Sequence, residues 1–173
     1  ALSITSGTTT INLGNAKVVT KNYTSISITG TGQLAFSNPH ASGTIIILKS
    51  QGAVILTSSA DPNIQASNLG AAGGAGGAAA SPGSDGTTAI PLSDSGTNHH
   101  GTGGTTGGPN GVGGAIYANT GLYTITAARY QAFGRFVSPG SGGGGGAGGT
   151  APNTGGAGGR GGGVLVVECA GDL

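Results

Sequence analysis

The sequence predicts a mainly β or irregular protein with little or no α-helix. Of the 173 residues, 40 are Gly and 6% are charged, whereas average usage is about 7% Gly and about 25% charged residues. Residues 1–69 carry short apolar clusters at strand-like spacing, and residues 70–173 carry glycine at a period of three. We therefore expect N-terminal β-strands, in a sandwich or a short solenoid-like arrangement, followed by a packed bundle of polyglycine II helices.

The N-terminal region, residues 1–69, has the pattern of short β-strands. Ile26 and Ile28 alternate with Ser and Thr, which is the period of two expected of a strand with one buried face. Further apolar clusters follow at nearly even spacing, separated by turns that contain glycine: Leu34/Phe36, Ile45–Leu48 and Val54–Leu56. This spacing is consistent with a β-sandwich, a meander or a few solenoid rungs, and the sequence does not choose among them.

Most glycines lie in residues 70–173, where they form Gly-Gly-x triplets. A period of three is that of the polyproline II helix, which has three residues per turn. We assign a structural role in such helices to Gly73, Gly74, Gly76, Gly77, Gly142, Gly143, Gly145, Gly146, Gly148, Gly149, Gly155, Gly156, Gly158, Gly159, Gly161 and Gly162.

The triplet has a physical reason. A helix of this type has no internal hydrogen bonds, so a buried one needs main-chain partners on its neighbours. Backbones approach closely enough only where no Cβ intervenes. Glycine at two of three positions leaves two edges free for contact, while the third edge carries Ala, Thr or Arg. A flexible linker and a collagen helix are the competing explanations. The broken register and the seven prolines argue against collagen.

The predicted organisation is therefore a β-rich region, 1–69, and a polyglycine II region, 70–173. The second region closes with an apolar β-strand at 164–168, Val-Leu-Val-Val-Glu. We expect the two regions to pack as one unit, because glycine helices gain little free energy from each hydrogen bond and need a flanking sheet. Ser3–Leu13 is a candidate strand for pairing with a neighbouring molecule.

Five of the seven aromatic residues lie between the glycine runs, in residues 115–139. They either complete the core or form a surface for a receptor, since aromatic rings and guanidinium groups suit stacking and polar recognition. Residues 124–136 have the spacing of a short helix. The candidate receptor-binding residues are Tyr117, Tyr123, Arg129, Tyr130, Phe133, Arg135 and Phe136.

Catalytic chemistry is not indicated. No lysine follows a glycine run as a phosphate-binding loop requires, and the five acidic residues form no evident pair. His99-His100 has no second ligand cluster for a metal, and Cys169 follows an apolar strand as a buried small residue would. We expect a non-enzyme without cofactor or metal. The net charge of +1 argues against nucleic acid as a partner, and no apolar run is long enough to span a membrane.

The Gly-Gly-x runs and the apolar strand after the last one (Gly161-Gly162-Gly163-Val164-Leu165-Val166-Val167-Glu168) resemble the glycine-rich domains of phage tail-fibre adhesins and bacterial surface proteins. The resemblance covers roughly residues 70–168. It implies stacked polyglycine-type helices whose connecting loops, here 79–100 and 115–139, bind a cell-surface receptor.

Three functions are compatible with these features. The first is a structural, self-assembling subunit of an extracellular filament, fibre or surface layer, whose partners are copies of itself. The second is a phage tail-fibre or other receptor-binding adhesin, whose partner is a cell-surface receptor or glycan. The third is an ice-binding protein, although the threonine rows are irregular. An extracellular, cell-surface or virion location fits all three and a chain that begins at Ala1.

Overall fold

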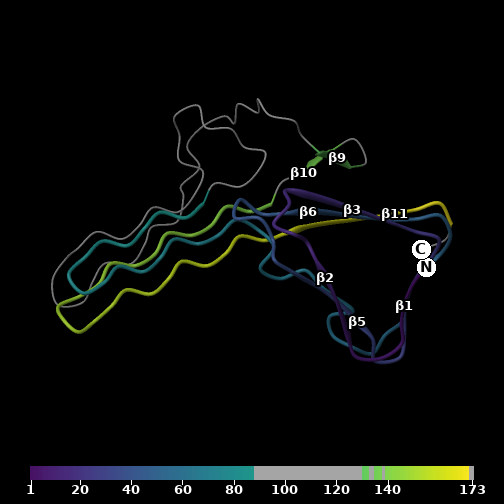
Figure 1. Ribbon diagram of the computed structural model, residues 1–173, viewed down its shortest axis with the longest axis horizontal. Coiled ribbons are helices and arrows are strands. Elements are labelled where there is room, and N and C mark those ends of the chain that lie inside the picture. The colour runs from purple at the N-terminus through teal and green to yellow at the C-terminus, as the bar shows by residue number, and fades with distance from the viewer. Residues whose placement is uncertain (88–129, 133–134, 138, 172–173) are drawn as a thin grey trace. The chain divides into compact units, whose positions relative to one another are not determined.

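The structure is a computed structural model, and it describes residues 1–87, 130–132, 135–137 and 139–171 (Figure 1). The described residues are mainly β and contain no helix, as the sequence predicts. The chain folds into two compact units. The solenoid unit comprises Ala1–His40, Thr44–Ser67 and Val164–Leu173, and the glycine-rich unit comprises Ala41–Gly43 and Asn68–Gly163.

The strands of the solenoid unit are short, with two to six residues each. They are β1 (Leu2–Ile4), β2 (Thr8–Asn12), β3 (Val18–Tyr23), β4 (Ile26–Ile28), β5 (Gln33–Ser37), β6 (Ile45–Ser50), β7 (Val54–Leu56), β8 (Ile64–Gln65) and β11 (Val164–Cys169). The apolar clusters expected at 26–28, 34–36, 45–48, 54–56 and 164–168 all form strands.

These strands form three parallel sheets, with the orders β1-β4-β7, β2-β5-β8 and β3-β6-β11. Consecutive strands belong to successive sheets, and each sheet receives one strand from every turn of the chain. This arrangement is a parallel β-solenoid of three rungs. Rung 1 is β1, β2 and β3; rung 2 is β4, β5 and β6; rung 3 is β7, β8 and β11. Figure 1 views the rungs along their stacking direction, so the sheets form the sides of a triangle. Of the arrangements that the sequence left open, this pairing is the solenoid-like one.

The core of the solenoid lies inside the triangle and is built from stacked, in-register side chains. Ile4 pairs with Ile28, and Ile28 pairs with Leu56. Ile28 and Leu34 are fully buried, as are Ile46 and Leu48 on β6. β6 lies in the middle of its sheet, which explains its run of isoleucines: a central strand of a parallel sheet is commonly buried on both faces.

Ser3–Leu13, the candidate strand for pairing with a neighbouring molecule, lies within the solenoid. This stretch forms β1 and β2, which pair with β4 and β5 of the same chain. β1 and β2 are edge strands of their sheets, so the pairing of this stretch with a neighbouring molecule stays a prediction.

Asparagine supplies left-handed backbone at corners of the coil. Asn15 follows β2, Asn38 follows β5 and Asn68 follows β8, and all three have φ between 54° and 57°. Asparagine tolerates this region better than other residues with a Cβ. After Asn15 and Asn38 the chain enters β3 and β6. After Asn68 it enters the glycine-rich unit instead, and it completes rung 3 only at β11.

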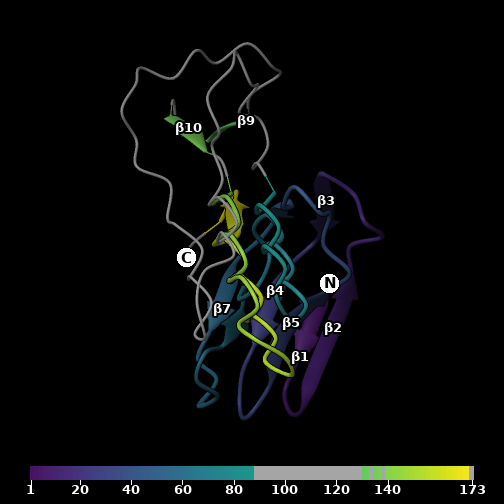
Figure 2. The same ribbon diagram turned by 90° about the vertical axis from the view of Figure 1, so that its left-hand side faces the viewer.

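In the glycine-rich unit, four extended stretches run side by side: residues 70–80, 81–87, 140–149 and 155–162 (Figures 1 and 2). They contain no assigned helix or strand beyond a bridge between Ser42 and Ala71. Main-chain hydrogen bonds of 2.7 to 2.9 Å run from stretch 70–80 to stretch 140–149 at every third residue. These bonds join the amides of Ala71, Gly74, Gly77 and Ala80 to the carbonyls of Gly140, Gly143, Gly146 and Gly149.

The same spacing links the other neighbours. Stretches 70–80 and 140–149 each bond to both 81–87 and 155–162. The further bonds, donor first, are Ser84–Ala75 and Thr87–Ala72; Gly142–Thr87, Gly145–Ser84 and Gly148–Ser81; Gly140–Gly162, Gly143–Gly159 and Gly146–Gly156; and Gly155–Gly77, Gly158–Gly74 and Gly161–Ala71.

Two further strands lie in the glycine-rich unit. β9 (Tyr130–Ala132) and β10 (Arg135–Val137) form an antiparallel pair. The short helix suggested for 124–136 is therefore wrong in its described part. The i, i+3, i+7 spacing of the apolar residues there also fits a hairpin of β-prone aromatic and branched side chains. The final apolar strand, expected at 164–168 as the close of the glycine-rich region, is β11, which pairs with β6 in the solenoid unit.

Candidate functional surfaces

The receptor-binding residues predicted from the sequence lie outside the part of the chain whose side chains the structure describes. Tyr117, Tyr123, Arg129 and Phe133 are not among the described residues, and neither is His99-His100. Tyr130, Arg135 and Phe136 belong to β9 and β10, of which the structure describes the backbone alone. Their role in receptor binding stays a prediction.

Chemically active groups are sparse in the described residues. No three His, Cys, Asp or Glu side chains gather there as a metal site would require. No described helix is long and apolar enough to cross a bilayer. The thiol of Cys169 is half-buried, rather than buried as expected, and its Sγ lies 3.3 Å from the carbonyl oxygen of Gly171.

The glycine stretches leave no room for side chains on the edges that face each other. A Cβ on Gly73, Gly76, Gly142 or Gly145 would overlap a carbonyl group of the neighbouring stretch. Stretch 155–162 differs, because only alternate glycine positions are crowded in this way. A Cβ on Gly155, Gly158 or Gly161 would overlap stretch 140–149, whereas one on Gly156, Gly159 or Gly162 would meet nothing within 4 Å.

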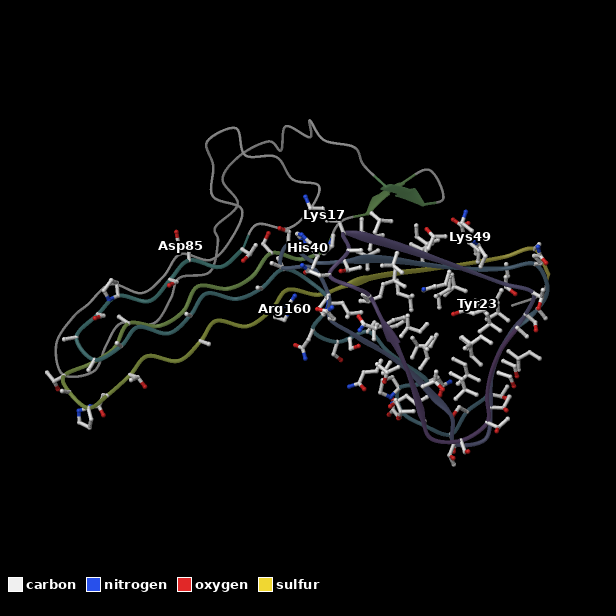
Figure 3. The ribbon with its side chains drawn as sticks, viewed as in Figure 1. Lys17, Tyr23, His40, Lys49, Asp85 and Arg160 are labelled. Carbon is white, nitrogen blue, oxygen red and sulfur yellow. The ribbon has the colours of Figure 1, made fainter. Side chains whose placement is uncertain are left out.

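Arg160 occupies the third position of a triplet, where the predicted pattern allows a side chain. Its guanidinium Nη2 donates a hydrogen bond of 2.9 Å to the carbonyl oxygen of Gly70, on the stretch that lies beside its own (Figure 3). This contact joins the first and last stretches of the unit, next to the main-chain bond from Gly70 N to Gly161 O.

The exposed large apolar side chains of the described residues all lie on the two end rungs. They are Val18 on β3, which is 48% exposed, and Ile55 and Leu56 on β7, which are 46% and 38% exposed. Leu56 is the most informative of these. It is in register with the fully buried Ile28, so it sits on the inward face of its sheet. It remains exposed because no described segment adds a fourth rung over it.

Rung 1 ends differently, because polar groups occupy several of its inward positions. Lys21 is in register with the buried Leu48, and Thr9 is in register with the buried Leu34, yet both are exposed. Tyr23 is in register with Ser50 and lies inside the triangle in Figure 3. Burial raises the pKa of the Tyr23 hydroxyl above its ordinary value of 10.0.

The charged residues of the solenoid unit are divided between its ends. Residues 1–24 contain Lys17 and Lys21 and no acid. The described residues of rung 3 and of the corner between β7 and β8 contain two acidic residues, Asp61 and Glu168, and no basic residue. Lys49 on rung 2 points out of the triangle in Figure 3, and its ammonium lies 3.0 Å from the Glu168 carboxylate. Because both side chains are more than a third exposed, this pair contributes about 0–1 kcal/mol.

The sheet β2-β5-β8 carries the threonine row Thr8-Thr9-Thr10, on β2. On its outward face Thr8 lies beside Gln33, Thr10 beside Ala35, and Asn12 beside Ser37. Threonine therefore does not recur from rung to rung along these positions.

Sequence reasoning did not single out the two end rungs of the solenoid. The signals were present, because Lys17 and Lys21 precede every acid in the chain, and Ile55 and Leu56 follow each other without alternation. These residues can be assigned to the end rungs only when the register shows which strands lie at the edges of the sheets.

No family model, no curated protein and no solved structure matches this chain.

Proposed function

We propose that the chain is a structural, self-assembling subunit of an extracellular filament, fibre or surface layer. The observation that carries the proposal is the pair of sheet edges, at rung 1 and at rung 3, that the described residues leave unpaired. Each of the three sheets has a rung 1 strand at one edge and a rung 3 strand at the other. Stacked repeats normally need terminal repeats with polar outer faces to remain soluble. Within the described residues, rung 3 ends on apolar side chains instead.

Free strand edges favour association because their amides and carbonyls are a template for another strand. A partner that adds a strand gains main-chain hydrogen bonds and buries apolar side chains at once. Leu56 and Ile55 supply the apolar part at the rung 3 end. The role proposed here is non-catalytic, and an extracellular setting suits a chain that has few charges and abundant Ser and Thr.

The four stretches of the glycine-rich unit support the same role. We propose that they are polyglycine II-type helices. The hydrogen bonds at every third residue and the crowding at the glycine Cβ positions favour this assignment. A bundle held by main-chain bonds is a stiff spacer without a large apolar core, which suits a repeating structural element.

Concentration-dependent assembly tests the proposal. The purified full-length chain should form polymers, visible by negative-stain electron microscopy, and its light scattering should rise with protein concentration. A single species of monomer mass over the whole soluble range would rule the function out. An adhesin without assembly would instead remain monomeric and bind host cells, and substitution of Tyr123 and Arg129 by Ala would abolish that binding.

A further inference from the structure

We infer that two copies of this chain pair side by side through one edge of the glycine-rich unit, on stretch 155–162. The inference rests on the proposed self-assembly and adds a lateral contact to it, with a second copy as the partner. Three observations carry it: main-chain amides without partners at this edge, glycines that the described packing does not require, and an edge that can pair with itself.

Two sets of glycine alternate along stretch 155–162. The packed glycines are Gly155, Gly158 and Gly161, and the edge glycines are Gly156, Gly159 and Gly162. The amides of the packed glycines donate to stretch 70–80, and the carbonyls of the edge glycines accept from stretch 140–149. The amides of the edge glycines have no hydrogen-bond partner among the described residues, and all three residues are exposed. Every third amide of the stretch is therefore open to a further stretch.

The packing inside the unit does not explain why the edge positions are glycine. A Cβ on any packed glycine would overlap stretch 140–149, but one on any edge glycine would meet nothing within 4 Å. None of the edge glycines has a positive φ. Alanine would be favoured at such positions, because it restricts the unfolded chain more than glycine does. A row of glycines is instead what the close approach of another backbone requires.

A second copy of the same edge fits this requirement. A neighbour must lack side chains along the contact and must offer carbonyls, as the stretches of this unit do for one another. The exposed Ala157 offers such a carbonyl, which accepts no bond within the described residues. Arg160, the only long side chain of stretch 155–162, is held toward Gly70 by its hydrogen bond. The contact would thus continue the packing that already joins the stretches inside the unit.

The pairing of the two copies would be antiparallel. Stretch 155–162 already runs antiparallel to stretch 70–80, because successive donors along it meet acceptors in descending order, Gly77, Gly74 and Ala71. A two-fold axis across the edge gives the same arrangement between two copies and sets the same surface on both sides of the contact. Such a contact closes after two copies. It therefore yields pairs, whereas the growth of a filament requires the sheet edges of the solenoid unit.

A variant that fills the edge tests the inference in the full-length chain. Gly156→Val with Gly159→Val places side chains where the single chain has room and the paired chain has none. Pairing should weaken at least about 100-fold, measured as a dimer dissociation constant by sedimentation velocity. The matched control, Ala75→Val with Ala78→Val, adds two valines at exposed positions of stretch 70–80 and should pair like the original chain. Circular dichroism and thermal unfolding check that both variants are folded.

Hydrogen exchange locates the contact at single residues. In the original chain the edge amides should exchange at least about tenfold more slowly as the protein concentration rises, because pairing gives them partners. The amides of the packed glycines are the internal control, since their bonds to stretch 70–80 should protect them at every concentration. Protection of the edge amides that does not depend on concentration would reveal a partner within one chain and would overturn the inference. This measurement decides the question if the valine variant does not fold.

The outcomes separate the two proposals. A chain that stays monomeric defeats the proposed function and this inference together. Polymers whose edge amides exchange fast, or an edge variant that pairs like the original chain, leave the proposed function standing and overturn the lateral contact. Pairs that never grow into polymers, with protected edge amides, support the lateral contact and rule out the proposed function.

Discussion

Adjacent glycines of one triplet lie in different surroundings, which makes Gly158 and Gly159 a matched pair. A Cβ on Gly158 would overlap the carbonyl of Gly143, whereas one on Gly159 would meet nothing within 4 Å. We predict that Gly158→Ala lowers the free energy of unfolding by about 1–3 kcal/mol, because the neighbouring stretch must move away.

Gly159→Ala should change stability little, or raise it by up to about 1 kcal/mol through the lower entropy of the unfolded chain. Urea denaturation of both variants measures the difference. Equal stabilities would contradict the close packing of stretches 140–149 and 155–162.

A buried threonine at the corner before β6 provides a second test. Thr44 is fully buried; its Oγ1 donates a hydrogen bond of 2.8 Å to the carbonyl of Ala16 and accepts one of 2.9 Å from the amide of His40. Thr44→Val keeps the shape but removes both bonds. We predict a loss of about 1–3 kcal/mol for each buried group that loses its partner.

The control for this test is Thr10→Val, since Thr10 is exposed on β2. Its stability should stay within about 0.5 kcal/mol of the original. Thermal unfolding of the two variants compares them directly, and a similar effect at both positions would argue against the role of Thr44.

At the scale of elements, β11 depends on the glycine-rich unit that precedes it. Residues 66–163 separate β8 from β11, although the two belong to one rung. The glycine-rich unit brings its own ends together, since Gly70 N donates to Gly161 O and Gly161 N donates to Ala71 O. The residues that follow β8 and those that precede β11 therefore lie close together, although many residues separate them in the sequence.

We predict that loosening the glycine stretches also weakens the pairing of β11 with β6. If 68–163 became a flexible loop in place of a corner as short as 38–44, closing it would cost about 2 kcal/mol more. In Gly158→Ala, hydrogen exchange at Val164–Cys169 should therefore accelerate more than exchange within β4. Exchange that changes equally in both strands would show that β11 is held independently.

The sequence predicted many elements but not their pairing. The alternation of Ile26 and Ile28 correctly predicted a strand with one buried face, and β4 buries both isoleucines. The same pattern did not predict that the partners of β4 are β1 and β7. The aromatic candidates between the glycine runs remain untested, because their side chains lie outside the described residues.

At the scale of the whole molecule, the partly buried phenol of Tyr23 makes stability depend on pH. Its folded-state pKa is raised by burial above 10.0. The unfolded chain therefore releases this proton at lower pH than the folded chain does. The associated stability is fully present below the unfolded-state pKa and is lost as the pH rises through the folded-state value.

We predict that the free energy of unfolding falls above about pH 10 and that Tyr23→Phe removes part of this fall. Comparison of the two chains by urea denaturation isolates Tyr23 from the other groups that titrate in this range. Parallel curves for the original chain and the variant over pH 9–12 would contradict the prediction.

The sequence by itself determined the class of structure: composition excluded a large apolar core, the period of two located strands, and the period of three located close-packed glycine stretches. Only the tertiary structure decided that the strands coil in parallel and that β11 completes a rung begun before the glycine-rich unit. It also decided that Lys21 lies on the first rung of the coil and Leu56 on the last. The periodicity of apolar residues indicates which face of a segment is buried, because the pattern lies in residues that are close together in the sequence. The partner that buries it is chosen by contacts between distant parts of the chain, which leave no local pattern.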